Sequence, residues 1–197
     1  TLHFGLQDDP ARARKGLLNA LRRVDDTLQT GFVGTPFLCR ELSAMGRDDL
    51  SYALLLREDY PSWLYEVKMG ATTIWERWNS VMPDGHISGP GMNSLNHYAY
   101  GAVVEWMYRN MIGIRPVAEE PGFRKAQIKP QPDYRMQWAK MELRSAAGTY
   151  RVGWRMETPT RNGSRKMHIS VTVPFNAEAE VWLPDADAGE IAGGVQD

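Results

Sequence analysis

The first half of the chain carries apolar residues at helical spacing. Leu17, Leu21 and Leu28 lie on one such stripe, which predicts a helix over residues 10–27. Asp9 before it is a good capping residue for that helix. Similar but shorter patterns predict further helices, which cover residues 35–45, 48–59, 62–69 and 96–112. Short helices joined by short loops are expected to pack as antiparallel pairs.

The period of the apolar residues changes from 3.6 to 2 after a linker-like segment at residues 114–122, which contains Pro116, Pro121 and Gly122. Strict alternation then follows in four segments, which begin at Ala139, Tyr150, Met167 and Ala177. Alternation predicts strands with one buried face. We therefore predict helices over residues 1–113 and an antiparallel β-domain over residues 114–197, built as half of a sandwich or as a sheet packed on the helices.

The amino-acid composition narrows the classes of binding partner that we expect for this protein. With 23 basic and 24 acidic side chains in 197 residues the formal net charge is −1, so no overall field would attract nucleic acid or an anionic membrane. No apolar run is long enough to span a membrane. Cys39 is the only cysteine, which excludes an internal disulfide and slightly favours the cytoplasm. The sequence begins at Thr1 and has neither an initiator Met nor a signal peptide. We therefore expect the chain to be a piece of a longer protein.

One short segment suggests chemistry. Glu76 lies between Trp75 and Trp78, and a carboxylate in such a place can deprotonate a water while the indoles face a sugar ring, restrict water or fill the protein wall. Inverting hydrolysis of a glycosidic bond needs two such carboxyl groups roughly 6.5–9.5 Å apart. The alternative interpretation is that Glu76 and Arg77 form an ordinary solvated ion pair near a helix end.

A second candidate pair follows downstream. Asn96 is expected to cap a helix that begins there, and His97 to donate to a sugar hydroxyl or to serve as a satisfied structural histidine. Elsewhere no set of His, Cys or carboxylate residues has metal-ligand spacing, and no phosphate-binding loop is present. We therefore expect neither a metal nor a cofactor.

Four sequence motifs occur in the same order as in a known enzyme family. Residues 30–38, 60–65, 70–78 and 96–101 resemble the C-terminal part of bacterial α-L-rhamnosidases of glycoside hydrolase family seventy-eight, and the likeness continues through residues 121–124 and 128–130. The resemblance implies an (α/α)6 barrel followed by a C-terminal β-domain. Residues 1–113 would then be the last helices of a partial (α/α)6 toroid, and residues 114–197 an antiparallel, β-sandwich-like domain.

The resemblance also implies a reaction, the removal of terminal α-L-rhamnose with inversion. Glu76 would be the general base, His97 would contact the rhamnose hydroxyls, and Trp75, Trp78 and Asn96 would belong to the sugar pocket. The general acid of the family lies in an Asp-rich segment upstream, which has no counterpart here. We therefore expect the isolated chain to be inactive on its rhamnose-containing glycoside, and to recruit the missing half of the barrel or to self-associate.

Two other functions fit the same residues. Another (α/α)6 sugar enzyme, such as a glycoside phosphorylase, would require phosphate and no base for water. A non-catalytic carbohydrate-binding fragment would use the aromatic residues for affinity alone. Replacing Glu76 separates these functions, because loss of a base lowers the rate by orders of magnitude whereas loss of a binding contact mainly lowers affinity.

Overall fold

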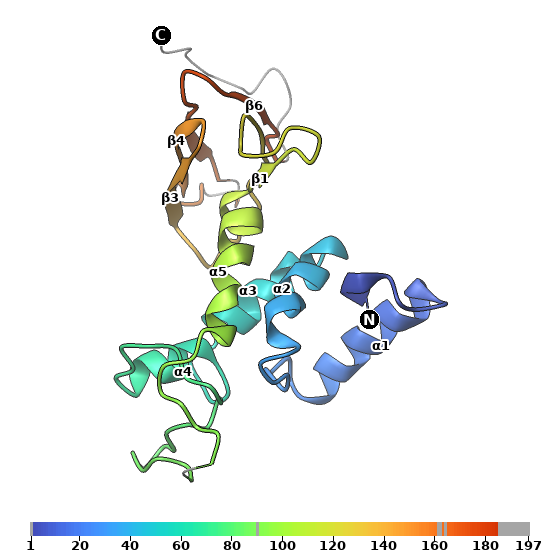
Figure 1. Ribbon diagram of the computed structural model, residues 1–197, viewed down its shortest axis with the longest axis vertical. Helices are drawn as coiled ribbons and strands as arrows, with labels where there is room; N and C mark the ends of the chain where they lie inside the picture. Colours follow the sequence, from blue (N-terminus) through green and yellow to red (C-terminus); the bar gives the residue numbers. More distant parts are fainter. Residues whose placement is uncertain (1, 90, 161–162, 164, 185–197) are drawn as a thin grey trace. The chain divides into compact units, whose positions relative to one another are not determined.

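The computed structural model describes residues 2–89, 91–160, 163 and 165–184 (Figure 1). Contacts divide the chain into two compact units, unit 1 (Thr1–Trp106) and unit 2 (Met107–Asp197). Unit 1 is helical and unit 2 contains all of the strands that are described. In the part of the chain that the structure describes, no helix combines the length and the hydropathy needed to cross a membrane.

Unit 1 begins with a helix whose ends follow local chemistry. A short 3-10 turn, η1 (Leu2–Phe4), precedes α1 (Pro10–Arg23), and the Asp9 carboxylate caps α1 by accepting from the Arg12 amide. The helix ends four residues before the expected position. Asp25 and Asp26 there have φ values of 53° and 47°, in the left-handed region that interrupts a right-handed helix.

The remaining helices of unit 1 build its core. They are α2 (Thr35–Ala44), α3 (Asp48–Leu56), α4 (Trp63–Lys68), the 3-10 turn η2 (Ala99–Ala102) and α5 (Val103–Trp106). Trp106 is buried against Tyr52 in an edge-to-face contact of 5.2 Å, and its indole N–H donates to Ser43 Oγ over 2.8 Å. The indole therefore adds apolar area to the core without leaving a buried donor unsatisfied.

The predicted helix over residues 96–112 differs from the observed one. The backbone becomes helical only at Ala99, and η3 (Met107–Ile112), a π-helical segment, opens unit 2. The amide of Asn96 donates to Ser94 Oγ and the amide of His97 donates to Ile74 O, so both backbones are held by partners outside any helix. The expected capping role of Asn96 is therefore wrong, and the His97 ring accepts from the Ala99 amide instead.

Within the residues that the structure describes, the strands of unit 2 form two three-stranded sheets after η3. One sheet has the order β1-β2-β6, with β1 (Ile114–Pro116), β2 (Lys125–Ile128) and β6 (Glu178–Val181). The other has the order β3-β4-β5, with β3 (Trp138–Ser145), β4 (Gly148–Met156) and β5 (Met167–Thr172), and is antiparallel throughout. The three alternating segments over β3, β4 and β5 form strands as predicted.

The fourth alternating segment forms a strand in the other sheet. β6 does not extend the sheet beside β5 but pairs with β2, in parallel, with Ala126 opposite Ala179. The Glu178 amide starts this pairing by donating to Arg124 O over 2.8 Å. Only one residue of β6 is even partly buried, so its alternation does not encode which sheet it joins.

The two sheets share one core. Tyr150 on β4 is fully buried, and its hydroxyl lies 2.8 Å from Phe123 O and 3.3 Å from Glu178 O, next to the strands of the other sheet. Ile128 on β2 is likewise fully buried. Trp154 on β4 donates its indole N–H to Met111 O at the end of η3 over 2.8 Å. Unit 2 is therefore sandwich-like, in agreement with the predicted fold class of partial toroid helices followed by a β-domain.

Candidate active site around Glu76

The segment that carries Glu76 is irregular, and neighbouring chain segments hold it at three consecutive residues. α4 ends at Lys68, and the described residues between it and Ala99 form no helix. Ile74 O accepts from the His97 amide over 2.8 Å, the Trp75 amide donates to Glu66 Oε2 over 3.2 Å, and the Glu76 amide donates to Ser94 O over 2.9 Å. Glu76 is thus not on a helix, yet its backbone position is determined on both sides.

The Glu76 carboxylate is nearly buried and asymmetrically bound. The residue is 9% exposed, and its Oε2 accepts from the Ser94 amide over 2.7 Å. Across the described ranges of the chain, Oε1 makes no hydrogen bond and the carboxylate has no ion pair with Arg77. Arg77 instead donates Nη2 to Ser88 O over 2.6 Å. One carboxylate oxygen is therefore anchored and the other is left for a small polar group such as water.

His97 presents a donor next to this carboxylate segment. Its Nδ1 accepts from the Ala99 amide over 3.3 Å, so a neutral ring carries its proton on Nε2. The ring is stacked on Tyr98 at 5.1 Å and lies 5.8 Å from the ring of Phe32. Tyr98 is 84% exposed and Phe32 is 43% exposed. These rings form an open aromatic edge, and the Nε2–H can donate to a ligand hydroxyl there.

Trp75 and Trp78 are both buried, so their indoles belong to the protein wall beneath the Glu76 segment rather than to the surface. Trp78 is stacked on Tyr100 with ring centroids 3.8 Å apart and 4° between the planes, and it forms a T-shaped pair with Trp63, with ring centroids 5.3 Å apart. The Trp78 indole N–H donates to Thr30 O over 2.9 Å. Of the roles that the sequence left open for the indoles, this geometry supports filling of the wall.

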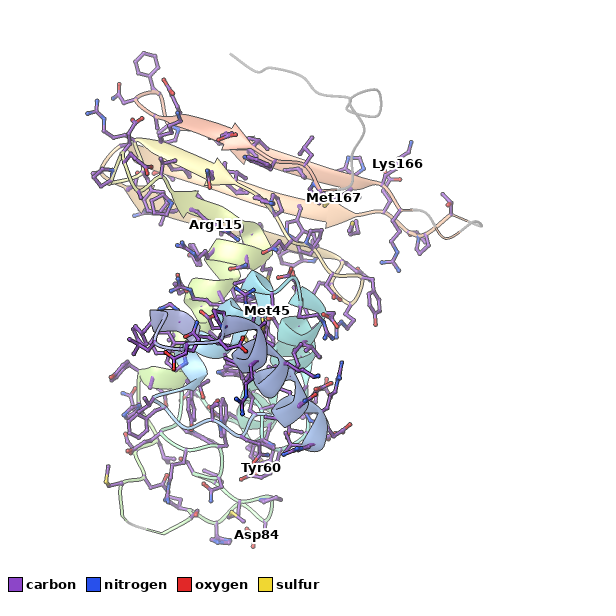
Figure 2. All side chains as sticks on the ribbon, turned by 90° about the vertical axis from the view of Figure 1, so that its right-hand side faces the viewer. Met45, Tyr60, Asp84, Arg115, Lys166 and Met167 are labelled. Atoms are coloured by element: carbon purple, nitrogen blue, oxygen red, sulfur yellow. The ribbon has the colours of Figure 1, made fainter. Side chains whose placement is uncertain are left out.

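Asn96 lies at the exposed rim. Its amide donates to Ser94 Oγ over 3.1 Å, and Ser94 Oγ donates back to Asn96 O over 3.0 Å. These bonds hold the Asn96 backbone at the surface, next to Ser94, which anchors Glu76. The loop before it is ordered by Asn93, whose Nδ2 lies 2.8 Å from Ser88 O and 3.2 Å from Ser80 O. Asp84 occupies the outer tip of this loop (Figure 2).

Sequence reasoning missed Glu66. This residue on α4 is 1% exposed; Oε2 accepts the Trp75 amide, whereas Oε1 is buried without a hydrogen-bond partner. Burial raises the pKa of Glu66 to about 7, although the hydrogen bond from Trp75 acts in the opposite direction. A signal was available, because Glu66 follows Trp63 by three residues on a short helix and so shares its buried face.

The site residues also interact through their charges. Burial raises the pKa of Tyr100 to about 12, and the negative charges of Glu66, Tyr60 and Glu76 add to that effect. Glu66 and Glu76 therefore both lie within electrostatic reach of the same phenol. Within the described ranges, no three His, Cys, Asp or Glu side chains converge in a way that would hold a metal ion.

Comparison with known sequences assigns both parts of the chain. Residues 1–111 match the family described as the bacterial alpha-L-rhamnosidase 6 hairpin glycosidase domain. Residues 113–196 match the bacterial alpha-L-rhamnosidase C-terminal domain. The chain therefore belongs to the bacterial alpha-L-rhamnosidases, a family of glycoside hydrolases.

Individual relatives agree with this assignment. An alpha-L-rhamnosidase from Alteromonas sp. (strain LOR) is 43% identical over 180 residues, which are 91% of this chain and 19% of the relative. One from Streptomyces avermitilis is 40% identical over 186 residues, 93% of this chain and 17% of the relative. The chain thus spans less than a fifth of the length of these relatives.

Solved structures extend the comparison to the fold. The crystal structure of the Streptomyces avermitilis alpha-L-rhamnosidase complexed with L-rhamnose has a TM-score of 0.78 at 40% identity, over 89% of this chain and 16% of that one. A native α-L-rhamnosidase from Aspergillus terreus has a TM-score of 0.83 at 35% identity, over 93% of this chain and 21% of that one. The helices and the β-domain of this chain therefore correspond to part of a rhamnosidase.

Proposed function

We propose that this chain is the C-terminal portion of an inverting glycoside hydrolase that removes terminal α-L-rhamnose, and that Glu76 is its general base. The observation that carries the proposal is the asymmetric carboxylate. Oε2 is anchored on the Ser94 amide, while Oε1 has no hydrogen-bond partner in the part of the chain that the structure describes. A carboxylate held in this way can accept a proton from water without losing its position.

The proposed reaction uses this free carboxylate oxygen. Water between Glu76 Oε1 and the anomeric carbon transfers a proton to the carboxylate as its oxygen attacks, and the bond from carbon to the leaving oxygen breaks on the opposite face. A second carboxyl group, roughly 6.5–9.5 Å away, protonates the leaving oxygen. Attack and departure on opposite faces invert the configuration, so the first product is β-L-rhamnose.

The sugar pocket draws on the residues around Glu76. His97 donates Nε2–H to a rhamnose hydroxyl, because its Nδ1 is occupied by the Ala99 amide. Trp75 and Trp78 form the apolar wall behind the carboxylate, and Asn96 lies at the rim. A relative that is 40% identical was crystallised with L-rhamnose, which supports a pocket of this kind for one sugar ring.

The general acid is expected from the barrel half that the relatives carry outside the matched segment. We therefore propose that the isolated chain does not hydrolyse rhamnosides. Activity should appear in a chimaera in which this chain replaces the corresponding segment of the Alteromonas relative, to which it is 43% identical. Rhamnose release from an aryl rhamnoside by the isolated chain would contradict this proposal, and so would an inactive chimaera that is folded.

Replacing Glu76 in the chimaera tests the role of the base. Glu76→Gln should lower kcat by about 1,000-fold or more, with a far smaller change in KM. Azide needs no deprotonation, so it should restore turnover and yield the inverted rhamnosyl azide. Glu58→Gln is the matched control, because Glu58 is exposed and paired with Lys68. A Glu76→Gln chimaera that keeps more than about a tenth of kcat would rule out the role.

A further inference from the structure

We infer that Glu66 is a positioning residue for Glu76, because its carboxyl group holds the Trp75 amide and so determines the backbone from which the Glu76 side chain projects. The inference rests on the proposed function of Glu76 as the base. Glu66 is not itself a candidate catalytic residue. At 1% exposure it lies behind the wall and has no access to a substrate.

The contact with Glu66 differs from the other two that hold the Glu76 segment. Ile74 and Glu76 are bound by backbone groups of His97 and Ser94, which belong to one downstream stretch. The Trp75 amide lies between them and is bound by a side chain from α4. Of the three hydrogen bonds at Ile74, Trp75 and Glu76, this is the one that joins the segment to a helix, whereas the other two connect it to another irregular stretch.

The helix that carries Glu66 is itself well anchored. The buried Ser62 caps α4 by accepting from the Tyr65 amide over 3.0 Å. Trp63 donates its indole N–H to Tyr100 O over 2.9 Å. The backbone carbonyl of Glu66 also accepts from the Ala71 amide over 3.0 Å, so main chain and side chain both bind the segment that leads to Glu76. A carboxyl group on such a support transmits the helix position to Trp75 with little freedom.

The surroundings favour a neutral carboxyl group at Glu66. Its Oε1 is buried without a hydrogen-bond partner, which would be costly for a charged oxygen. The Tyr100 phenol lies in electrostatic reach of Glu66 and is negative when ionised, so it offers no positive charge that would stabilise a carboxylate. The pKa of Glu66, raised to about 7 by burial, agrees with this view. A neutral acceptor at Glu66 positions the segment and leaves the negative charge at Glu76.

Two substitutions in the chimaera test this role. Glu66→Gln keeps a neutral acceptor of the same length, so kcat should stay within about threefold of the parent. Glu66→Asp keeps a carboxyl group but withdraws it by one methylene, so it should lose the Trp75 amide. We expect kcat to fall about 10- to 100-fold with KM nearly unchanged, since a displacement of about 1 Å in a reacting group has an effect of this size.

Hydrogen exchange supplies a readout that does not depend on turnover. In the peptide that spans residues 70–78, the Glu66→Asp chimaera should exchange faster than the parent and the Glu66→Gln chimaera should not. Glu66→Met separates positioning from space filling, because Met has a similar volume but only a weak acceptor for the Trp75 amide. Its exchange should be as fast as that of the Asp chimaera if the acceptor positions the segment, and as slow as that of the parent if Glu66 only fills space. Equal kcat and equal exchange in the Asp variant would overturn the inference, and so would a Gln variant as impaired as Asp.

The Glu76→Gln chimaera, measured in parallel, separates the positioning role of Glu66 from the proposed role of Glu76 as the base. If it loses activity while both Glu66 variants keep kcat, Glu66 has no positioning role and the proposed base stands. If it remains active, the proposed function fails and the inference about Glu66 fails with it. Should the Asp variant not fold, the Glu66→Met chimaera decides: a loss of kcat and faster exchange beside a parental Gln variant support the inference, and parental kcat and exchange in the Met variant overturn it.

Discussion

Glu76 and Ser94 are joined by two hydrogen bonds in opposite directions. The Ser94 amide donates to Glu76 Oε2 over 2.7 Å, and the Glu76 amide donates to Ser94 O over 2.9 Å. The first bond orients the carboxylate and the second fixes the backbone behind it. These bonds connect the segment that carries the proposed base to the segment that carries His97. A substitution at Ser94 should therefore displace the Glu76 carboxylate.

Removing the Ser94 amide should impair the proposed base. Ser94→Pro eliminates the N–H that binds Oε2. A hydrogen bond to a charged group contributes about 1.5–3 kcal/mol, so kcat of the chimaera should fall about 10- to 150-fold. Ser94→Ala is the matched control, because it keeps both backbone bonds and loses only the hydroxyl contacts to Asn96. Aryl rhamnoside kinetics that show equal losses in the two variants would contradict the role of the amide.

His97 is expected to affect binding more than rate. His97→Ala removes the Nε2–H donor and should raise KM of the chimaera about 3- to 10-fold, which is the effect of one neutral hydrogen bond of about 0.5–1.5 kcal/mol. His86→Ala serves as the control, because that histidine is exposed and bonded to Asp84 in the outer loop. Initial rates over a range of rhamnoside concentrations separate KM from kcat. A drop in kcat without a change in KM would argue against a ground-state contact.

The buried Glu66 should make unit 1 less stable at higher pH. Its folded pKa of about 7 lies above the ordinary value of 4.5 for a glutamate in the unfolded chain, so the folded state binds the proton more tightly than the unfolded state. The stabilisation is fully present below about pH 4.5 and is lost as the pH rises through 7. From pH 5 to pH 8 the loss should be roughly 1–3 kcal/mol.

Urea unfolding of the chain, followed by tryptophan fluorescence, measures this loss. Glu66→Gln cannot ionise, so its free energy of unfolding should lack this part of the pH dependence. Comparing the variant with the parent at each pH cancels the titration of the four histidines, which both proteins share. Identical pH profiles for parent and variant would mean that the Glu66 carboxyl group is not perturbed.

Gly113 should be indispensable for unit 2. Its φ is +93°, and a Cβ there would lie 2.2 Å from the carbonyl carbon of Lys129. Gly113→Ala therefore requires a backbone shift in the β1-β2 pairing and should destabilise unit 2 by more than about 3 kcal/mol. Gly122 also has a positive φ, of +81°, but a Cβ there would meet nothing within 4 Å.

The pair of glycine variants separates steric overlap from backbone strain. Gly122→Ala should cost only about 1 kcal/mol, the penalty for a left-handed alanine. Thermal unfolding followed by the near-ultraviolet circular dichroism of Trp154 and its neighbours measures both variants. Similar melting temperatures for the two would show that the backbone at Gly113 relaxes readily.

Much of the fold could be predicted from the sequence, because the buried face of a helix or strand places apolar residues at a regular spacing. The stripe of Leu17, Leu21 and Leu28 predicted α1, and the alternation that begins at Tyr150 predicted β4, with Tyr150, Val152 and Trp154 all buried. Side chains of one face share one environment, so a helix or a half-buried strand can be recognised locally. The motif around Glu76 likewise pointed to the rhamnosidase family.

Other features depend on contacts between distant segments. β6 pairs with β2 across some fifty residues of sequence, Asn96 does not cap a helix, and Glu66 reaches the Trp75 amide from α4. Each of these is decided by which backbone N–H or C=O meets which partner. Every residue except proline carries the same two backbone groups, so side-chain patterns say little about their pairing.

The sequence by itself therefore determined the family, the helical and β portions, and the residue proposed as the base. The tertiary structure alone decided how that residue is held: one carboxylate oxygen on Ser94, its backbone flanked by contacts to His97 and Glu66. The physical reason is that identity and periodicity are properties of single residues and short segments. The position of a carboxylate depends on backbone hydrogen bonds between segments that meet only when the chain has folded.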